Sequence, residues 1–275
     1  WHIYSPEDQD RERTQERVYW NEKVKEALST DSLGVVFQPI QDIERQELSH
    51  FEALLRVADD DGKPLPTFKF IQSAEASGLI QEVDLRIVDK VLRYKQNLER
   101  QGVDAVFAIN LSGISFRNPH LHAEVARKLK FYEVNPDEII FEITETAAVE
   151  DSVSTAEKMR AIKRLGCKFA LDDFGVGFSS LYHIKQLPID LVKIDGSFIR
   201  HLASEAEDRA LVRAVVEVAK VFELQTVAEF VEDQEILEIL QELGVDYAQG
   251  YHISRPVPFE EIWEEPNAPR LRRGG

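Results

Sequence analysis

The sequence has a single cysteine, Cys167, and no long apolar segment. One cysteine excludes an internal disulfide and fits a reducing compartment. No run approaches the ~18 to 20 apolar residues of a transmembrane helix, and the polar start, WHIYSPEDQD, is unlike a signal peptide. Because the first residue is Trp rather than Met, we expect a fragment of a longer protein. We also expect the protein to be cytoplasmic, either by itself or as the cytoplasmic portion of a larger signalling protein. We expect no membrane insertion of this fragment.

Positive charge is scarce. The sequence has 33 Lys and Arg residues against 50 Asp and Glu residues, a formal net charge of −17. This balance argues against non-specific binding to DNA or to an anionic membrane. If the ligand is itself an anion, some local positive charge is needed, and a bound metal cation is the obvious candidate.

The chain is expected to have three parts. Residues 1–30 are rich in Asp, Glu, Arg and Gln, and we interpret them as a mostly exposed linker or signalling helix. Residues 31–265 alternate short β-rich runs with helical stretches, which is typical of repeated βα units. Residues 266–275 form a C-terminal tail. A chain of 275 residues is long enough for one α/β barrel.

The apolar runs predict eight strands, at 34–40, 48–57, 105–111, 138–144, 167–173, 191–195, 225–231 and 245–251. Helices are predicted between most of them, at 68–76, 84–99, 123–130, 154–165, 209–222 and 234–243. The connection between the first two runs is short and lacks a helical period, which favours an antiparallel hairpin. The predicted fold class is therefore α/β, a modified (βα)8 barrel with one antiparallel strand.

Most of these runs contain or end in a polar side chain that can bind a cation. In chain order these residues are Glu52, Asn110, Glu142, Asp172, Asp173, Lys193, Asp195, Glu229 and Gln249. A buried strand normally avoids carboxylates, because each is costly to desolvate unless it is paired or metal-bound. In a βα barrel the carboxyl ends of the strands converge on one face. The sequence therefore predicts several carboxylates, an amide and a lysine around one cavity.

The ligands offered by these positions are oxygens, with no Cys or His among them. Oxygen ligands favour Mg²⁺ or Mn²⁺ over Zn²⁺, and the adjacent Asp172 and Asp173 suit a site with two bridged ions. Each residue alone has an ordinary explanation, such as a helix cap for Asp173, a turn for Asn110 or a solvated lysine for Lys193. Their recurrence on successive runs makes these separate explanations improbable together. The seven histidines lack ligand spacing and are interpreted as surface residues.

Eight segments resemble the sequence blocks of the EAL family, in the family's order. They are FQPI (37–40), FEALLR (51–56), INLS (109–112), FEITET (141–146), LDDFGVGFSSL (171–181), VKID (192–195), VAEFVE (227–232) and QGYHISRP (249–256). The resemblance covers roughly residues 30 to 265. The first 30 residues resemble the connecting helix that follows a GGDEF, or diguanylate cyclase-like, domain. This implies an upstream GGDEF or sensory domain in the parent protein.

The resemblance implies a modified TIM barrel that hydrolyses cyclic di-GMP to linear pGpG with two Mg²⁺ or Mn²⁺ ions, and a homodimer. By position, Glu52, Asn110, Glu142 and Asp172 resemble ligands of the first ion, and Asp172, Asp173 and Glu229 serve the second. Lys193 resembles the lysine that positions the attacking water, and Glu229 resembles the general base. Glu52 is also expected to be a catalytic residue. Substrate-contacting or adjacent positions are Gln38, Arg56, Asp195, Glu232 and Gln249, and Glu145 resembles the anchor of the DDFGVGFSS loop. Ca²⁺ is expected to inhibit, because its bonds are longer and its geometry looser.

The chain departs from the family pattern at Phe230, where many members have Gly, and at Val176 and Phe178, where Thr and Tyr are common. None of these changes removes an implied ligand. One alternative is a catalytically weak receptor module that binds cyclic di-GMP and signals to a partner. Another is a barrel hydrolase that acts on a different phosphoester. A turnover assay with Mg²⁺ separates the enzyme from the receptor, and a panel of substrates tests the second alternative.

Overall fold

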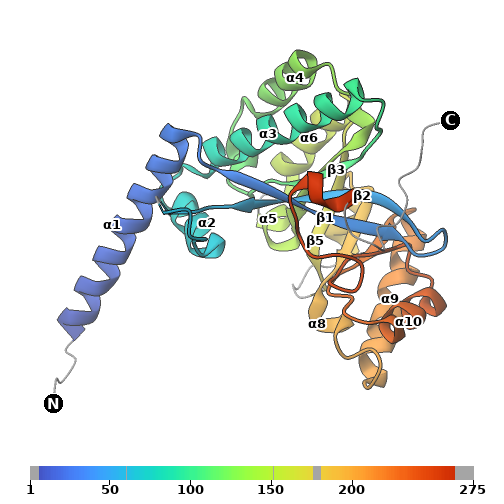
Figure 1. Cartoon of the computed structure of the whole chain (residues 1–275). Helices are drawn as coiled ribbons and strands as arrows, with labels where there is room; N and C mark the ends of the chain where they lie inside the picture. The colour runs from blue at the N-terminus through green and yellow to red at the C-terminus, as the bar shows by residue number, and fades with distance from the viewer. Residues whose placement is uncertain (1–5, 60, 151, 176–180, 264–275) are drawn as a thin grey trace.

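Eight strands close into a barrel whose neighbours follow the order of the chain. The computed structural model describes residues 6–59, 61–150, 152–175 and 181–263 (Figure 1). The strands are β1 (Gly34–Asp42), β2 (Glu47–Arg56), β3 (Phe107–Asn110), β4 (Ile139–Thr144), β5 (Lys168–Phe174), β6 (Leu191–Ile194), β7 (Gln225–Ala228) and β8 (Tyr247–Ala248). The predicted barrel and its eight strands are confirmed.

The reversed strand is β1, which pairs antiparallel with both β2 and β8, whereas the other neighbours are parallel. A tight turn joins β1 to β2, in which the Gln46 N–H donates to the Asp42 carbonyl at 2.9 Å. This confirms the predicted hairpin. The reversal also brings Gln38 of β1 opposite Glu52 of β2. A side chain of the reversed strand therefore joins the same part of the barrel as the predicted site residues.

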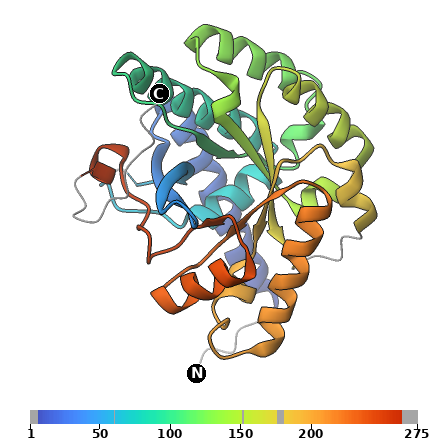
Figure 2. The same cartoon turned by 90° about the vertical axis from the view of Figure 1, so that its right-hand side faces the viewer.

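Helices surround the strands on the outside (Figure 2). The α-helices are α1 (Pro6–Thr30), α2 (Thr67–Ala76), α3 (Ile80–Arg100), α4 (Leu121–Tyr132), α5 (Glu145–Glu150), α6 (Ser152–Lys163), α7 (Leu181–Gln186), α8 (Gly196–Ile199), α9 (Ala206–Val221) and α10 (Gln234–Leu243). Short 3-10 turns lie at η1 (Ser115–Arg117), η2 (Pro136–Glu138) and η3 (Phe259–Trp263). The six helices predicted between the strands are confirmed. The helices α5, α7 and α8 were not predicted, because elements of four to six residues are too short to show a helical period.

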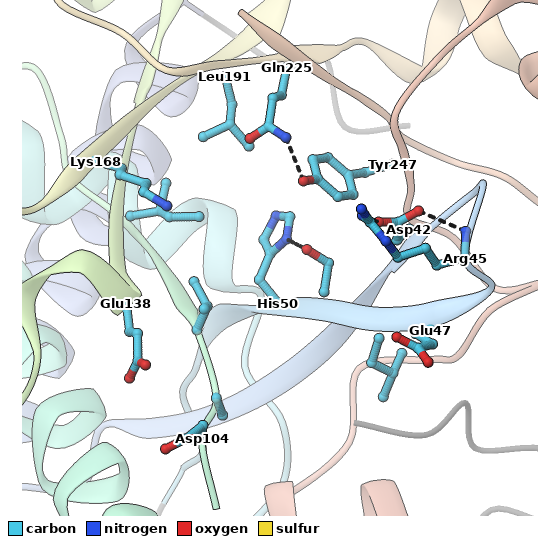
Figure 3. A pocket seen from close by; sticks show the side chains of 15 residues that line it. Asp42, Arg45, Glu47, His50, Asp104, Glu138, Lys168, Leu191, Gln225 and Tyr247 are labelled. Carbon is cyan, nitrogen blue, oxygen red and sulfur yellow. Dashed lines mark hydrogen bonds and ion pairs between the residues drawn. The ribbon is translucent and has the colours of Figure 1, made fainter. Parts of the chain in front are cut away.

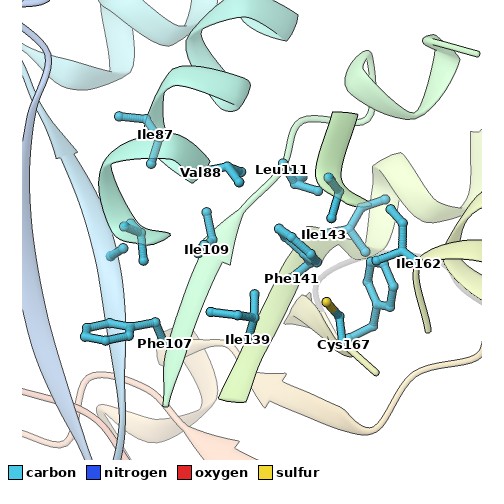
Figure 4. Close-up of a cluster of buried hydrophobic side chains, with 14 of the residues drawn as sticks. Ile87, Val88, Phe107, Ile109, Leu111, Ile139, Phe141, Ile143, Ile162 and Cys167 are labelled. Carbon is cyan, nitrogen blue, oxygen red and sulfur yellow. The ribbon is translucent and has the colours of Figure 1, made fainter. Parts of the chain in front are cut away.

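Alternate residues of each strand face opposite sides of the barrel wall. Outward residues such as Ile109 and Phe141 pack against helices, including Ile87 and Val88 of α3 (Figure 4). Inward residues form a small apolar layer across the barrel interior, made of Ile40, Ala108, Ile140, Ala170, Leu191 and Val227. This inner apolar layer separates the two mouths of the barrel, so each mouth can hold its own set of polar side chains.

The helix α1 confirms the helix expected near the start of the chain. Its C-terminal half buries Trp20, Val24, Ala27 and Leu28, whereas its N-terminal part extends away from the barrel (Figure 1). The division into residues 1–30, 31–265 and 266–275 stays a prediction, and the tail lies outside the described residues. None of the described helices combines the length and the apolar character that crossing a bilayer requires.

Candidate active site

Polar side chains form a layer directly above the inner apolar layer, at the carboxyl ends of the parallel strands. On four strands each polar residue follows an apolar one by two positions, as Glu142 follows Ile140 and Lys193 follows Leu191. Residues two apart in a strand share a face. The strands therefore bring residues from distant parts of the chain to one mouth of the barrel, as the sequence pattern predicted.

The ammonium group of Lys193 is the centre of this layer. Its Nζ lies 3.2 Å from Glu52 Oε2, 3.1 Å from Glu142 Oε2, 3.2 Å from Asp172 Oδ1 and 2.9 Å from Glu229 Oε1. Only 1% of the Lys193 side chain is exposed. One buried cation thus faces four carboxylates from four different strands or strand ends, which leaves the layer rich in negative charge.

Side-chain amides complete the layer around Glu52. Asn110 Nδ2 donates to Glu52 Oε1 at 2.8 Å, and Gln249 Nε2 donates to Glu52 Oε2 at 2.6 Å. Gln249 Nε2 also lies 3.1 Å from Gln38 Oε1, and Gln38 Nε2 donates to the Ser254 carbonyl at 3.2 Å. These bonds fix the rotamer of Glu52 and place Asn110, Gln38 and Gln249 beside the carboxylates.

Burial and charge shift the pKa values of these groups in different directions. Burial raises the pKa of Glu52, but Lys193 and the hydrogen bonds from Gln249 and Asn110 together lower it below the usual value. Burial raises the pKa of Glu142 well above the usual value, because attraction to Lys193 does not offset it. Burial lowers the pKa of Lys193, yet Asp172 and the neighbouring glutamates raise it well above its usual value. The lysine therefore stays charged.

Asp172, Asp173 and Glu229 form a group that could hold a metal ion, since one carboxylate oxygen from each lies within 4.8 Å of the others. Asp172 Oδ1 is buried and accepts no hydrogen bond, although Lys193 Nζ is 3.2 Å away. Burial raises the pKa of Asp173, with Asp172 adding to the shift, and burial raises the pKa of Glu229 to about 7. An oxygen-only donor set, in which a buried carboxylate oxygen has the Lys193 ammonium beside it but accepts no hydrogen bond, fits a hard divalent cation.

A strand irregularity explains how two consecutive aspartates serve one mouth. In a regular strand Asp172 and Asp173 would point to opposite faces. Here the β5–β6 register shifts between Leu171 and Phe174, and Asp173 has φ of 56°. Asp tolerates this left-handed conformation better than most residues. The local bulge therefore lets both carboxylates reach the same cluster.

The chain after β7 turns sharply to present Glu229. The Glu229 N–H donates to the Ile194 carbonyl at 3.2 Å, and the Val231 N–H donates to the Gln249 carbonyl at 3.0 Å. Gly250 lies so close to this turn that a Cβ there would come within 2.1 Å of the Val231 carbonyl oxygen. The glycine after Gln249 thus permits two backbone segments to cross beside the site.

A cleft of about 530 Å³ opens beside the cluster, and Glu52 and Glu229 belong to its lining together with the predicted residues Gln38, Arg56, Glu232 and Gln249. Burial lowers the pKa of Arg56, whose guanidinium donates to the Leu55 carbonyl at 2.9 Å. A cleft of this size can hold a small molecule against the carboxylates.

Two predicted residues lie beside the cluster. Asp195 caps α8, where its Oδ1 accepts from the Ser197 N–H at 2.9 Å. Glu145 begins α5 and is buried, and its Oε2 accepts from the Gly175 N–H at 3.0 Å. That bond is the kind of contact expected of a loop anchor. The departures at Val176 and Phe178 fall on residues 176–180, outside the described residues.

Asp84, which was not predicted, is a buried residue of α3 next to the turn that follows Asn110. Its Oδ2 accepts from the Ser112 N–H at 2.8 Å and from the Ser115 hydroxyl at 2.6 Å. Burial raises the pKa of Asp84 to about 6. In the sequence Asp84 resembles any polar residue of an amphipathic helix, so no signal marked it as a support for the turn that carries Asn110.

The opposite mouth of the barrel holds a separate cavity of about 350 Å³ (Figure 3). Its lining includes His50, two residues before Glu52, and Lys168, two residues before Ala170. His50 is only 3% exposed, and burial lowers its pKa to about 3. The interpretation of every histidine as a surface residue was therefore wrong for His50, which packs edge-on against Tyr247 in the barrel interior.

Comparison with known proteins gives a consistent result. The family model for the EAL domain matches residues 21–256. The cyclic di-GMP phosphodiesterase PdeB of Shewanella oneidensis is 36% identical over 267 residues, which is 96% of this chain and 31% of that protein. The cyclic di-GMP phosphodiesterase PdeF of Escherichia coli is 32% identical over 250 residues, 91% of this chain and 33% of that protein.

A solved structure described as the PaMucR phosphodiesterase in complex with c-di-GMP superposes with a TM-score of 0.84 at 31% identity, covering 89% of this chain and 99% of that one. MucR of Pseudomonas aeruginosa, named a bifunctional diguanylate cyclase and cyclic di-GMP phosphodiesterase, is 31% identical over 249 residues, 90% of this chain and 36% of that protein. The chain thus spans about a third of the length of the curated relatives that it matches.

Proposed function

Because the chain belongs to the EAL domain family, we propose that it hydrolyses one phosphodiester bond of cyclic di-GMP to give linear pGpG. The observation that carries the proposal is the convergence of Glu52, Glu142, Asp172 and Glu229 on one buried mouth beside an open cleft. The naming of similar proteins as cyclic di-GMP phosphodiesterases supports the choice of substrate.

The residues at this mouth fit two divalent ions, Mg²⁺ or Mn²⁺. The first ion is assigned to Glu52, Asn110, Glu142 and Asp172, and the second to Asp172, Asp173 and Glu229. When bound, the two ions would supply the positive charge that ionises a water molecule and neutralises the phosphodiester. Support for this assignment comes from the oxygen-only donor set and from the buried Asp172 oxygen that accepts no hydrogen bond.

Glu229 and Lys193 are assigned the proton-transfer and positioning roles. A general base works best when its pKa is near the working pH, and burial raises the pKa of Glu229 to about 7. Lys193 stays protonated among the carboxylates and can hold the attacking water by hydrogen bonding. Glu52 contributes through its fixed carboxylate, which Asn110 and Gln249 orient.

The cleft residues Gln38, Arg56, Glu232 and Gln249 are assigned to substrate contact. Arg56 can form a two-pronged contact with a phosphate oxygen pair. Asp195 is assigned a place beside Asp173. The pKa of Asp173 is raised mainly by burial, then by the charge of Asp172, and then by the charge of Asp195. Glu145 is assigned to anchoring the loop after β5 through Gly175.

The test is turnover of cyclic di-GMP by purified protein with Mg²⁺ or Mn²⁺, followed by chromatographic detection of pGpG. Addition of Ca²⁺ is expected to inhibit, because longer bonds misplace the reacting groups. Binding of cyclic di-GMP without turnover under these conditions would reject the enzyme and favour the receptor module. Turnover of other phosphoesters at equal rates would reject the assigned substrate.

Two further features follow from the family relationship and belong to the proposal. We expect a homodimer, which sedimentation velocity can test. We also expect a GGDEF or sensory domain before residue 1 in the full-length protein, as the bifunctional name of MucR suggests for that relative. A cytoplasmic location stays a prediction.

A further inference from the structure

Arg200 and Phe230 form a stacked pair in the wall of the cleft, and the proposed chemistry gives neither of them a role. The guanidinium carbon of Arg200 lies 4.2 Å from the centroid of the Phe230 ring. Both side chains line the same cleft as Glu229 and Arg56. The pair therefore lies where a ligand that reaches Glu229 would pass.

The guanidinium of Arg200 stacks on Phe230 but pairs with no carboxylate of the described residues. Arg200 is exposed, and no ion pair in the part of the chain that the structure describes involves it. By contrast, Arg45 at the other mouth pairs with Asp42 at 2.6 Å. A planar cation that is held by an aromatic ring but lacks a carboxylate partner is available to bind a ligand.

The backbone of Phe230 adopts a conformation that is unfavourable for a residue with a large side chain. Its φ is 54°, in the left-handed region that bulky residues rarely adopt and that glycine adopts freely. The turn needs this conformation because Glu229 and Val231 are both fixed by backbone hydrogen bonds on either side. Strained residues of this kind cluster at functional sites.

The position of the Phe230 ring also requires that the residue it packs against, Gly196, has no side chain. A Cβ on Gly196 would lie 2.1 Å from Phe230 Cδ2, so the ring occupies space that any other residue at 196 would fill. The Phe230 side chain nevertheless remains 44% exposed. Gly196, Phe230 and Arg200 thus fit together as one unit, which fixes the ring and presents the guanidinium at the cleft.

We propose that Arg200, positioned by Phe230, contacts the ligand and sets its affinity by donating two parallel N–H bonds to a pair of acceptor atoms. This inference rests on the proposed function. On cyclic di-GMP the acceptor pair is either two oxygens of a phosphate or O6 and N7 of a guanine, both of which match the guanidinium fork. The cleft also contains Glu229 and Glu232, which repel an anion, so a second cation beside Arg56 offsets that repulsion.

The test compares the dissociation constant of cyclic di-GMP, measured by calorimetry, and its KM and kcat in four variants. Arg200→Met is expected to weaken binding about 10-fold, with the fall in kcat/KM carried mainly by KM. Arg200→Lys should be intermediate, because lysine keeps the charge but loses the fork. Phe230→Gly should weaken binding about 3-fold through loss of the stacked arrangement. Arg100→Met, which removes one charge from the exposed end of α3, is the matched control and should change neither constant.

Two further arms make the assignment specific. The double variant Arg200→Met with Phe230→Gly should bind no more weakly than Arg200→Met alone, because Phe230 acts through Arg200. The substrate bis(p-nitrophenyl) phosphate has a phosphodiester but no guanine. A higher KM of Arg200→Met for both substrates identifies the phosphate as the partner, and a higher KM for cyclic di-GMP alone identifies the guanine edge.

The proposal is overturned if Arg200→Met binds cyclic di-GMP within twofold of the wild-type protein, or if Phe230→Gly has its full effect in the Arg200→Met background. An effect confined to bis(p-nitrophenyl) phosphate also overturns it. Failure of the proposed function gives a different result, because the wild-type protein would then bind cyclic di-GMP without producing pGpG. In that case the dissociation constants of the variants, measured by calorimetry, still test the role of Arg200.

Discussion

The two mouths of the barrel carry charged side chains in different arrangements. At the carboxyl mouth four carboxylates share one buried ammonium, Lys193. At the opposite mouth Arg45 pairs with Asp42, and the ammonium of Lys95 pairs with only two carboxylates, those of Glu99 and Glu138. The inner apolar layer lies between them. An excess of acid around one cation creates a place for added cations, whereas ion pairs with little excess charge contribute mainly to the fold.

The largest expected difference between the mouths is in turnover. Asp172→Asn removes a carboxylate from the cluster and should lower kcat by at least ~10³-fold, a loss typical of removing one member of a catalytic unit. Glu138→Gln at the other mouth changes the same chemical group and should keep kcat within twofold. Steady-state assays with Mn²⁺ compare the two, and equal losses in both variants would contradict the assignment of the carboxyl mouth.

The next effect is on the stability of the metal-free protein. Lys193→Met leaves two buried carboxylates, Glu52 and Glu142, and two half-buried ones without their shared cation, so the free energy of unfolding should fall by about 3 to 5 kcal/mol. The loss should be smaller at low pH, where the carboxylates take up protons. Lys168→Met, at the exposed start of β5, should change stability by less than ~0.5 kcal/mol. Urea unfolding in EDTA measures both, and a loss below ~1 kcal/mol in Lys193→Met would show that the cluster is not held by this lysine.

A smaller effect concerns Asp84, which supports the turn after Asn110. Burial raises its pKa from 3.8 to about 6, so the folded state binds a proton more tightly than the unfolded state. Stability from this group is therefore present below pH ~4 and is lost as the pH rises through ~6. Asp84→Asn keeps an acceptor oxygen without the charge, so it should raise the free energy of unfolding by ~2 kcal/mol at pH 8 and by little at pH 4.

The control for Asp84 is Asp89 of the same helix. Partial burial works to raise the pKa of Asp89, but hydrogen bonds from Lys128 and Tyr132 lower it below its usual value. Its contribution to stability is therefore present above the usual pKa and is lost in acid. Asp89→Asn should lower stability at pH 8, opposite in sign to Asp84→Asn. Urea titrations at several pH values measure both, and the same sign in both variants would refute the buried, raised-pKa account of Asp84.

The smallest expected effect is on turnover when His50, a buried polar residue of the opposite mouth, is changed. His50 lies two residues before Glu52 on the same strand face, opposite Ile40 of the inner apolar layer, and its side chain lines the cavity of the opposite mouth. His50→Gln should therefore leave kcat and KM for cyclic di-GMP within twofold at pH 7.5. Steady-state kinetics provides the measurement. A tenfold fall in kcat would mean that the two mouths communicate along β2.

Much of the fold was predictable because its signals are local. Short apolar runs and helical periods placed the eight strands and the six helices between them, and the short connection after β1 revealed the reversed strand. The signals failed for α5, α7 and α8, which are shorter than two helical turns. They also failed for His50, because one histidine in a strand carries no sign of which mouth buries it.

The sequence by itself determined which residues are polar where a barrel strand should be apolar, and the convergence of strand ends in a βα barrel predicted that Glu142, Lys193 and Glu229 meet at one mouth. Only the tertiary structure decided that one ammonium serves four carboxylates, that a bulge turns Asp173 toward Asp172, and that Phe230 lies on Gly196 under Arg200. The physical reason is that the position of a residue near the end of a strand fixes which mouth of the barrel it can reach. Distances between strands depend on closure of the barrel, which brings together residues more than 100 positions apart.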